Sequence, residues 1–193
     1  MYNPPHFREE RIEVLHDFIR AHPLAALVTA GPAGLEANHL PLILDVDAGV
    51  LRGHVSRANT IWKESRPEAL AIFTGPDHYI SPSWYPSKQE HGRVVPTWNY
   101  TAVHVRGTLN FFEDATRLRA IVEELTAIHE AEFPQPWKVA DAPPEFVEGL
   151  LKAIVGFELQ IASLEGKWKA SQNRPEADRV SVAEALRKIE NAP

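Results

Sequence analysis

The chain has 193 residues, of which 44% are hydrophobic and 24% are charged, and it contains no cysteine. This size and composition are typical of a single globular domain with a substantial core, and we expect one domain over 1–193. The lack of cysteine excludes disulfides, thiolate nucleophiles and cysteine-ligated metal clusters. The net charge of −6 argues against direct DNA binding, which normally needs a basic surface.

Neither a targeting signal nor a membrane span is visible in the sequence. The first residues contain no basic segment followed by an apolar run, and no window approaches the roughly 18 apolar residues that a spanning helix needs. The sequence therefore predicts a cytoplasmic protein with no membrane contact.

The first half of the chain predicts one helix followed by short strands. Ile12, Leu15 and Ile19 share one helical face, and short apolar or alternating runs separated by turn residues follow. We expect a helix over 9–21, strands over 24–30, 36–44, 50–56 and 69–74, a turn over 31–34, and a short helix over 58–65.

The second half predicts a long loop, the longest strand and most of the helices. Three prolines interrupt residues 77–96, and connections of this length are usually functional or mobile. We expect strands over 97–112 and 157–161, and helices over 114–132, 143–151 and 175–193. Hairpin-linked strands without regular βαβ alternation favour a mainly β, α+β fold, in which an antiparallel barrel carries peripheral helices.

Residues 54–63 form the first candidate site, where a predicted strand ends and a short helix begins. Such a terminus favours anions, and Ser56, Arg57 and Asn59 add hydrogen-bond donors. Arg57 is expected to bind a phosphate bidentately. The alternative is an ordinary helix cap beside solvated basic residues, and the sequence leaves both interpretations open.

Three further segments combine aromatic and polar residues. Residues 79–86 and 95–100 could form the wall of a pocket for a planar ligand, or could simply pack as loop and strand aromatics. Residues 167–174 are basic and aromatic in an otherwise acidic chain, which suits an anionic ligand, a closing lid, or a solvated loop.

The nine histidines show no metal-binding spacing such as HExxH or HxH. His39, His54 and His104 would converge only if their strands are neighbours. We therefore predict no metal site.

The motifs together resemble a known family. The segments MYNPPHF, NHLPLIL, GHVSRAN, YISPSWY, VPTWNY and KASQNR occur in this order along nearly the whole chain. They resemble the PaiB-like family of FMN-binding proteins, described as negative transcriptional regulators. The resemblance implies a six-stranded antiparallel split β-barrel, the cofactor FMN, and a homodimer with the cofactor at the subunit interface.

The resemblance also implies which residues contact FMN. The phosphate is expected near the segment 54–63 and the ring near the start of the strand over 97–112. The segment 171–174 is expected to approach the site, from the same subunit or from its partner. The expected contacts are His54, Ser56, Arg57, Asn59, Trp62, Lys63, Thr97, Trp98, Asn99, Ser171, Gln172, Asn173 and Arg174.

Three functions remain open at this point. The first is an FMN-binding protein with or without flavin-dependent redox activity; any enzyme would be an FMN-dependent oxidoreductase, because the side chains supply no redox centre. The second is a regulator that acts through protein partners without catalysis. The third is a haem-binding or haem-degrading split-barrel protein.

Overall fold

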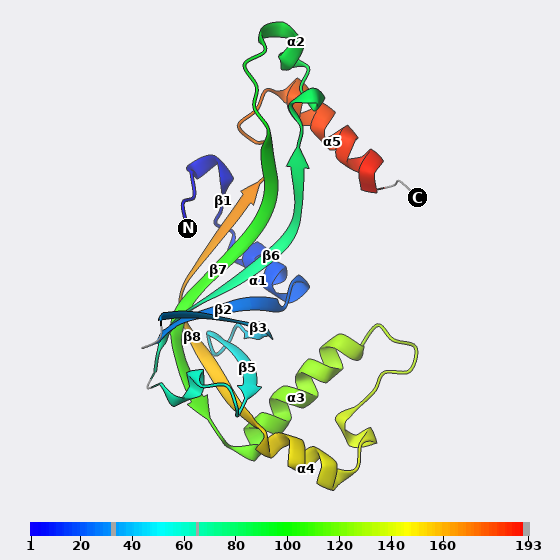
Figure 1. Ribbon diagram of the computed structural model, residues 1–193. Coiled ribbons are helices and arrows are strands. Elements are labelled where there is room, and N and C mark those ends of the chain that lie inside the picture. The colour runs from blue at the N-terminus through cyan, green and yellow to red at the C-terminus, as the bar shows by residue number, and fades with distance from the viewer. Residues whose placement is uncertain (32–33, 65, 191–193) are drawn as a thin grey trace.

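The computed structural model describes residues 1–31, 34–64 and 66–190, and it confirms an α+β fold built on an antiparallel sheet (Figure 1). The strands are β1 (Arg8–Glu9), β2 (Leu24–Gly31), β3 (Gly34–Pro41), β4 (Ile43–Asp45), β5 (Val50–Ser56), β6 (Glu68–Ile80), β7 (Thr97–Phe112) and β8 (Ile154–Lys169). The helices are α1 (Ile12–Ala21), α2 (Ser87–His91), α3 (Ala115–Glu130), α4 (Pro144–Lys152) and α5 (Glu176–Glu190). Short 3-10 turns are η1 (Pro5–Phe7), η2 (Ile61–Lys63), η3 (Pro82–Trp84) and η4 (Val139–Asp141).

Three predicted elements extend into positions outside the described residues. The turn expected over 31–34 includes 32–33, the short helix expected over 58–65 includes 65, and the C-terminal helix expected over 175–193 includes 191–193.

The strands form one sheet in the order β3-β2-β6-β7-β8-β5-β4. The short strand β1 is not part of this order and pairs with β8. All pairs are antiparallel. The two end strands, β3 and β4, are separated in sequence only by Leu42. Among the described residues, eight strands are present and no backbone ladder pairs β3 with β4 or β5, so the predicted six-stranded split barrel is not confirmed.

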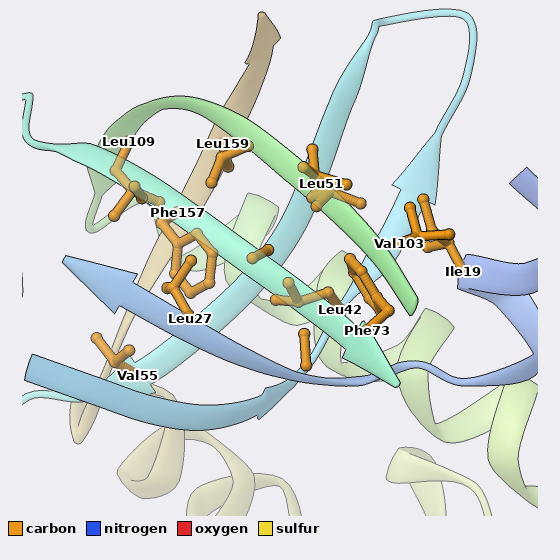
Figure 2. Close-up of a cluster of buried hydrophobic side chains, with 14 of the residues drawn as sticks. Ile19, Leu27, Leu42, Leu51, Val55, Phe73, Val103, Leu109, Phe157 and Leu159 are labelled. Atoms are coloured by element: carbon orange, nitrogen blue, oxygen red, sulfur yellow. The ribbon is translucent and has the colours of Figure 1, made fainter. Parts of the chain in front are cut away.

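The main core fills the concave side of this curved sheet. Residues of β2 and β6 alternate between buried and partly exposed, as expected for strands with one covered face. Leu27, Phe73, Val103 and Phe157 are fully buried and belong to one cluster (Figure 2). Ile19 brings helix α1 onto the same cluster. The strand patterning of the sequence is therefore sufficient to place the core.

Two strands are longer than the sequence predicts. Strand β6 continues through Gly75 and Pro76 to Ile80, because a register shift between Thr74 and Asp77 accommodates the proline, which cannot donate to a ladder. Strand β8 continues to Lys169, so part of the basic segment predicted as a loop is strand. The expectation that residues 77–96 lack regular structure was wrong, since they contain the end of β6, η3 and α2.

The continued strands create an extension that we call the arm: residues 77–100 together with α5 (Figure 1). The arm has a small core of its own, in which Ile80, Tyr85 and Val182 are buried together. A buried hydrogen bond also joins the two parts, since the hydroxyl of Ser87 donates to Asp178 at 2.7 Å. Helix α5 is thus fixed to the tip of the β6–β7 hairpin.

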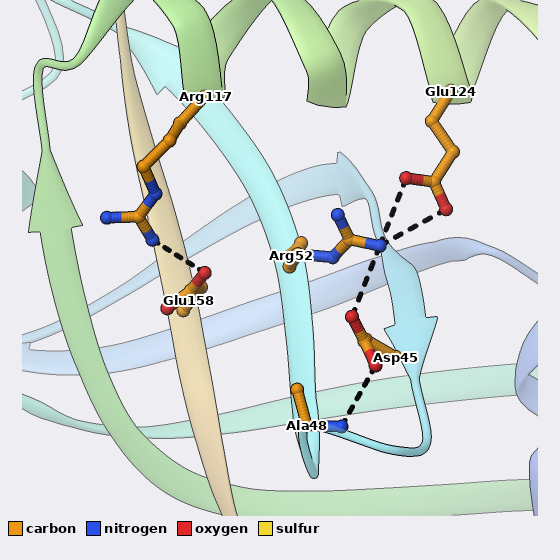
Figure 3. A network of polar contacts seen from close by, with 6 residues as sticks. All are labelled: Asp45, Ala48, Arg52, Arg117, Glu124 and Glu158. Carbon is orange, nitrogen blue, oxygen red and sulfur yellow. Dashed lines mark hydrogen bonds and ion pairs between the residues drawn. The ribbon is translucent and has the colours of Figure 1, made fainter.

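Helices α3 and α4 lie at the opposite end of the molecule from the arm (Figure 1). Helix α3 packs on β5 and β8, and two ion pairs hold it there (Figure 3). Arg52 of β5 lies 3.0 Å from Glu124, and Arg117 of α3 lies 2.6 Å from Glu158 of β8. The outer face of β5 is therefore covered by helices.

We expect Phe157→Ala to lower the free energy of unfolding by about 3–5 kcal/mol, because it opens a cavity in the main core. Urea denaturation followed by circular dichroism measures this change. Phe133→Ala is the matched control: its side chain is 60% exposed, so the change should stay within about 0.5 kcal/mol. Equal effects of the two substitutions would contradict the assignment of the core.

Candidate functional site

The segment that follows β5 is a tight turn held by its own side chains. The hydroxyl of Ser56 accepts a hydrogen bond from the Ala58 N–H at 3.2 Å, and the amide oxygen of Asn59 accepts one from the Ile61 N–H at 3.0 Å. Such side-chain bonds compete with helix formation. The helix predicted over 58–65 is therefore reduced to the single turn η2.

The exposed side of this turn carries the groups that an anion needs. Ser56, Thr60 and Lys63 are all exposed, and they supply two hydroxyls and one ammonium. We call residues 56–63 the cradle. A phosphate is compatible with this donor set, because hydroxyls and an ammonium stabilise negative charge without a large desolvation cost.

Arg57 fixes the cradle to the rest of the fold. Its Nε donates to the carbonyl of Lys152 at 2.7 Å, one Nη donates to the carbonyl of Ile154 at 3.3 Å, and the other pairs with Glu113. The indole N–H of Trp62 donates to the Arg57 carbonyl at 3.0 Å. Arg57 thus joins the cradle to the α4–β8 junction, and a bidentate phosphate contact would have to replace these bonds.

Asn38 is a neighbour of the cradle that the sequence analysis did not select. The amide of Asn59 donates to the Asn38 side-chain oxygen at 2.7 Å. Asn38 lies on β3, which is mostly exposed and ends the sheet order. The only sequence signal for this contact was the position of Asn38 inside the NHLPLIL motif.

His54 is half-buried and lies on the same side of β5 as Ser56. It lies on the outer face of β5 and lines an apolar cavity of about 540 Å³ beneath α3 and α4. Burial lowers the pKa of His54, so the imidazole is neutral at pH 7. A neutral imidazole adds little charge for binding a phosphate.

A second polar group lies at the base of the arm. Asn99 and Ser171 are buried and hydrogen-bonded to each other, with 3.1 Å between the Asn99 amide nitrogen and the Ser171 hydroxyl. The ammonium of Lys169 donates to the Thr97 hydroxyl and to the Trp98 carbonyl. A cavity of about 220 Å³ is bordered by Thr97, Asn99, Lys169, Ser171 and Arg174.

This arm cavity is positively charged. Burial, with the nearby charges of Lys167 and Arg174, lowers the pKa of Lys169. Asn173 also lines the cavity, whereas the Gln172 side chain bonds to backbone groups of its own turn. An anionic or electron-rich ligand edge would relieve the repulsion between the cations.

The ring of Trp98 lies on the surface of the arm. Trp98 is 53% exposed and faces Tyr79, its partner across the β6–β7 ladder, with 5.9 Å between the ring centroids. Tyr79 is 47% exposed, so the two rings form an aromatic surface available for stacking.

The structure groups the predicted contacts into two sets that lie far apart. Ser56 pairs with Ile154 at the start of β8, whereas Lys169, beside the arm cavity, ends the same strand. At about 3.3 Å per residue, these ends are on the order of 50 Å apart along the strand. One mononucleotide cannot reach both sets in a single chain.

The three strand histidines do not converge. His104 pairs with Ile72, which aligns through Ala26 with His39, so the two histidines are three strand spacings, about 14 Å, apart. His54 lies on β5, which forms ladders with β4 and β8 and not with the strands of His39 or His104. Within the described ranges, no group of three or more histidines and carboxylates could hold a metal ion.

The fold is similar to that of α+β proteins of known structure. It superposes with a TM-score of 0.63 on the FAD and heme binding protein from Mycobacterium smegmatis, at 14% identity over 90% of this chain and 78% of the other. It superposes with a TM-score of 0.60 on the flavocytochrome Anf3 from Azotobacter vinelandii, at 15% identity over 90% and 75%.

Sequence comparison then gives the family. Residues 1–163 match the family described as "Putative FMN-binding domain", and the chain belongs to it. The chain is 33% identical to the Bacillus subtilis protein named protease synthase and sporulation protein PAI 2, over 99% of this chain and 91% of that protein. It is 35% identical to the uncharacterized protein AN0679 from Emericella nidulans, over 90% and 85%. The predicted PaiB-like family and its cofactor FMN are thereby confirmed.

None of the described helices is long and apolar enough to cross a membrane.

We expect Arg57→Ala to lower the free energy of unfolding by about 1–3 kcal/mol, because two backbone carbonyls lose a charged donor. Glu113→Ala is the matched control. Glu113 is 57% exposed, so its ion pair should contribute less than about 1 kcal/mol. Chemical denaturation of both variants measures the difference, and a larger loss for Glu113→Ala would contradict the role given to Arg57.

Proposed function

We propose that the chain binds FMN as a homodimer, with the phosphate in the cradle of one subunit and the ring beside the arm of its partner. The observation that carries this proposal is the separation of the two residue sets along β8. In a two-fold dimer, each cradle can meet the arm of the other subunit, so two complete sites arise from two incomplete ones.

Each set has the chemistry that its role requires. Lys63 would neutralise the phosphate, while the hydroxyls of Ser56 and Thr60 would donate hydrogen bonds to its oxygens. Asn38 and the exposed edge of β3 would orient the part of the ligand next to the cradle. Trp98 would cover the ring and exclude water, and the cations of the arm cavity favour its electron-rich edge.

FMN, when bound, would supply electron or hydride transfer, because no side chain of this chain is a redox centre. The chain's own residues would bind and orient the ligand and limit its contact with water. If the protein is an enzyme, it is an FMN-dependent oxidoreductase.

A regulatory role would be indirect. The relative from B. subtilis is named for protease synthesis and sporulation, which suggests regulation of gene expression. The net charge of −6 opposes direct contact with DNA. We propose that any regulation acts through protein partners or through the flavin, inside the cytoplasm.

Haem binding is the second candidate. It is favoured by His54, whose Nδ1 is buried without a hydrogen bond beside the apolar cavity, and by neighbours of similar fold whose names include haem. Among the described residues that line this cavity there is no lysine or arginine to pair with the propionates of haem. FMN is therefore the better fit. A Soret band after haem titration would support haem, and its absence would exclude it.

We expect the protein to bind FMN, and quenching of flavin fluorescence measures this binding. Lys63→Ala should weaken the binding about 10- to 100-fold, because a charge-assisted phosphate contact is lost. The matched control is Lys138→Ala, another exposed lysine that lies outside the cradle and the arm, which should leave the affinity unchanged. If the wild-type protein gains neither flavin quenching nor thermal stability with FMN, the proposal fails. If the two variants bind alike, the phosphate lies outside the cradle.

A further inference from the structure

The cavity beneath α3 and α4 is separate from both residue sets of the proposed FMN site, apart from the edge formed by Ser56. It has a volume of about 540 Å³, within the range of about 300–1,000 Å³ for small-molecule sites. The outer face of β5 forms its floor, and α3, η4 and α4 form its walls. The Arg52–Glu124 and Arg117–Glu158 ion pairs join α3 to the sheet (Figure 3), and the hydrogen bond from Arg57 to the Lys152 carbonyl joins the end of α4 to β5.

The lining is almost entirely apolar. Val122, Val147 and Ile154 form its inner part, and Trp137, Phe146 and Leu150 form the rim. The three rim side chains are 47%, 57% and 53% exposed, respectively, although they lie together on one surface. A contiguous apolar patch of this kind marks a binding surface more often than a chance arrangement.

Charge restricts the occupant. The described residues that line the cavity include no lysine, arginine, aspartate or glutamate. A phosphate, carboxylate or ammonium placed there would lose hydration without gaining a partner. The occupant must therefore be uncharged, which also excludes FMN with its phosphate inside the cavity.

His54 supplies a polar contact in the lining. Its Nδ1 is buried and has no hydrogen-bond partner among the described residues. Because Nδ1 itself is covered by protein, a ligand hydrogen bond has to come from the part of the imidazole that lines the cavity. Burial also lowers the pKa of His54, so the neutral imidazole that matches an uncharged ligand is the form present at pH 7.

We propose that this cavity binds an uncharged, flat aromatic molecule carrying a hydrogen-bonding group, with that group on the part of the His54 imidazole that lines the cavity and the ring against Trp137 and Phe146. This site goes beyond the proposed FMN site and does not depend on it. A compact two-ring molecule with a carbonyl at its edge satisfies the volume, the apolar walls and the polar contact.

The test uses menadione, an uncharged two-ring quinone, with isothermal titration calorimetry on the FMN-saturated, oxidised protein. The charged control ligand is 2-naphthoate, which has a similar two-ring body. We expect menadione to bind and 2-naphthoate to bind at least about tenfold more weakly, because its carboxylate finds no partner.

Two substitutions and a matched control test the residues. Phe146→Ala should weaken menadione about tenfold through lost apolar contact, and His54→Ala about fivefold through the lost hydrogen bond. Phe133→Ala removes an equally exposed phenylalanine outside the lining and should change nothing. Flavin fluorescence, recorded on the same samples, reports FMN binding separately.

Four results would overturn the proposal. The first is that menadione fails to bind protein that retains FMN; the second is that 2-naphthoate binds equally well. The third is that FMN displaces menadione, which would make the cavity part of the flavin site. The fourth is that Phe146→Ala changes the oligomeric state in sedimentation velocity without changing menadione affinity, which would make the patch a subunit contact. Loss of FMN binding alone would instead refute the proposed function and leave this inference standing.

Discussion

The antiparallel ladder between β7 and β8 is the constraint on which the rest of the structure depends. It runs from Tyr100–Lys169 at the arm to Phe112–Gly156 beside the helices, with one register shift after Arg106. Gly107 permits this shift, since a Cβ there would lie 2.0 Å from the Gln160 carbonyl. A rigid two-stranded frame of this length fixes how far the cradle lies from the arm cavity.

The two ends of this frame are stabilised independently. At the helical end, ion pairs and the carbonyl contacts of Arg57 hold α3 and α4 against the sheet. At the arm, a small core and the buried Ser87–Asp178 bond hold α5 to the hairpin tip. Because each end has its own contacts, each can present a preformed half of a binding site, which lowers the entropic cost of binding.

Much of the fold could be predicted from residue patterns. Helical periodicity located α1, α3, α4 and α5, and period-two alternation located the core strands, because burial on one face leaves a signal in the sequence. The full length of β6 could not be predicted. Gly75-Pro76 is typical of a strand end, and only the partner strand shows that a bulge accommodates it.

The candidate site was less predictable, for a different reason. The residue types that bind phosphate also bind backbone groups, and sequence alone does not show which of the two they do. Arg57 illustrates this, since its donors meet the carbonyls of Lys152 and Ile154. The contact between Asn38 and Asn59 joins residues from different strands, so local spacing carries no signal for it.

The most direct test of the composite site uses a heterodimer. Lys63→Ala damages the cradle, and Trp98→Ala damages the arm. A heterodimer with one subunit of each kind can be isolated through two different affinity tags. One of its two composite sites then carries both substitutions, and the other site carries neither. The account predicts that this heterodimer binds about one FMN with wild-type affinity, while each variant homodimer binds FMN weakly at both sites. Two equally weakened sites in the heterodimer, or a wild-type chain that remains monomeric when it binds FMN, would contradict it.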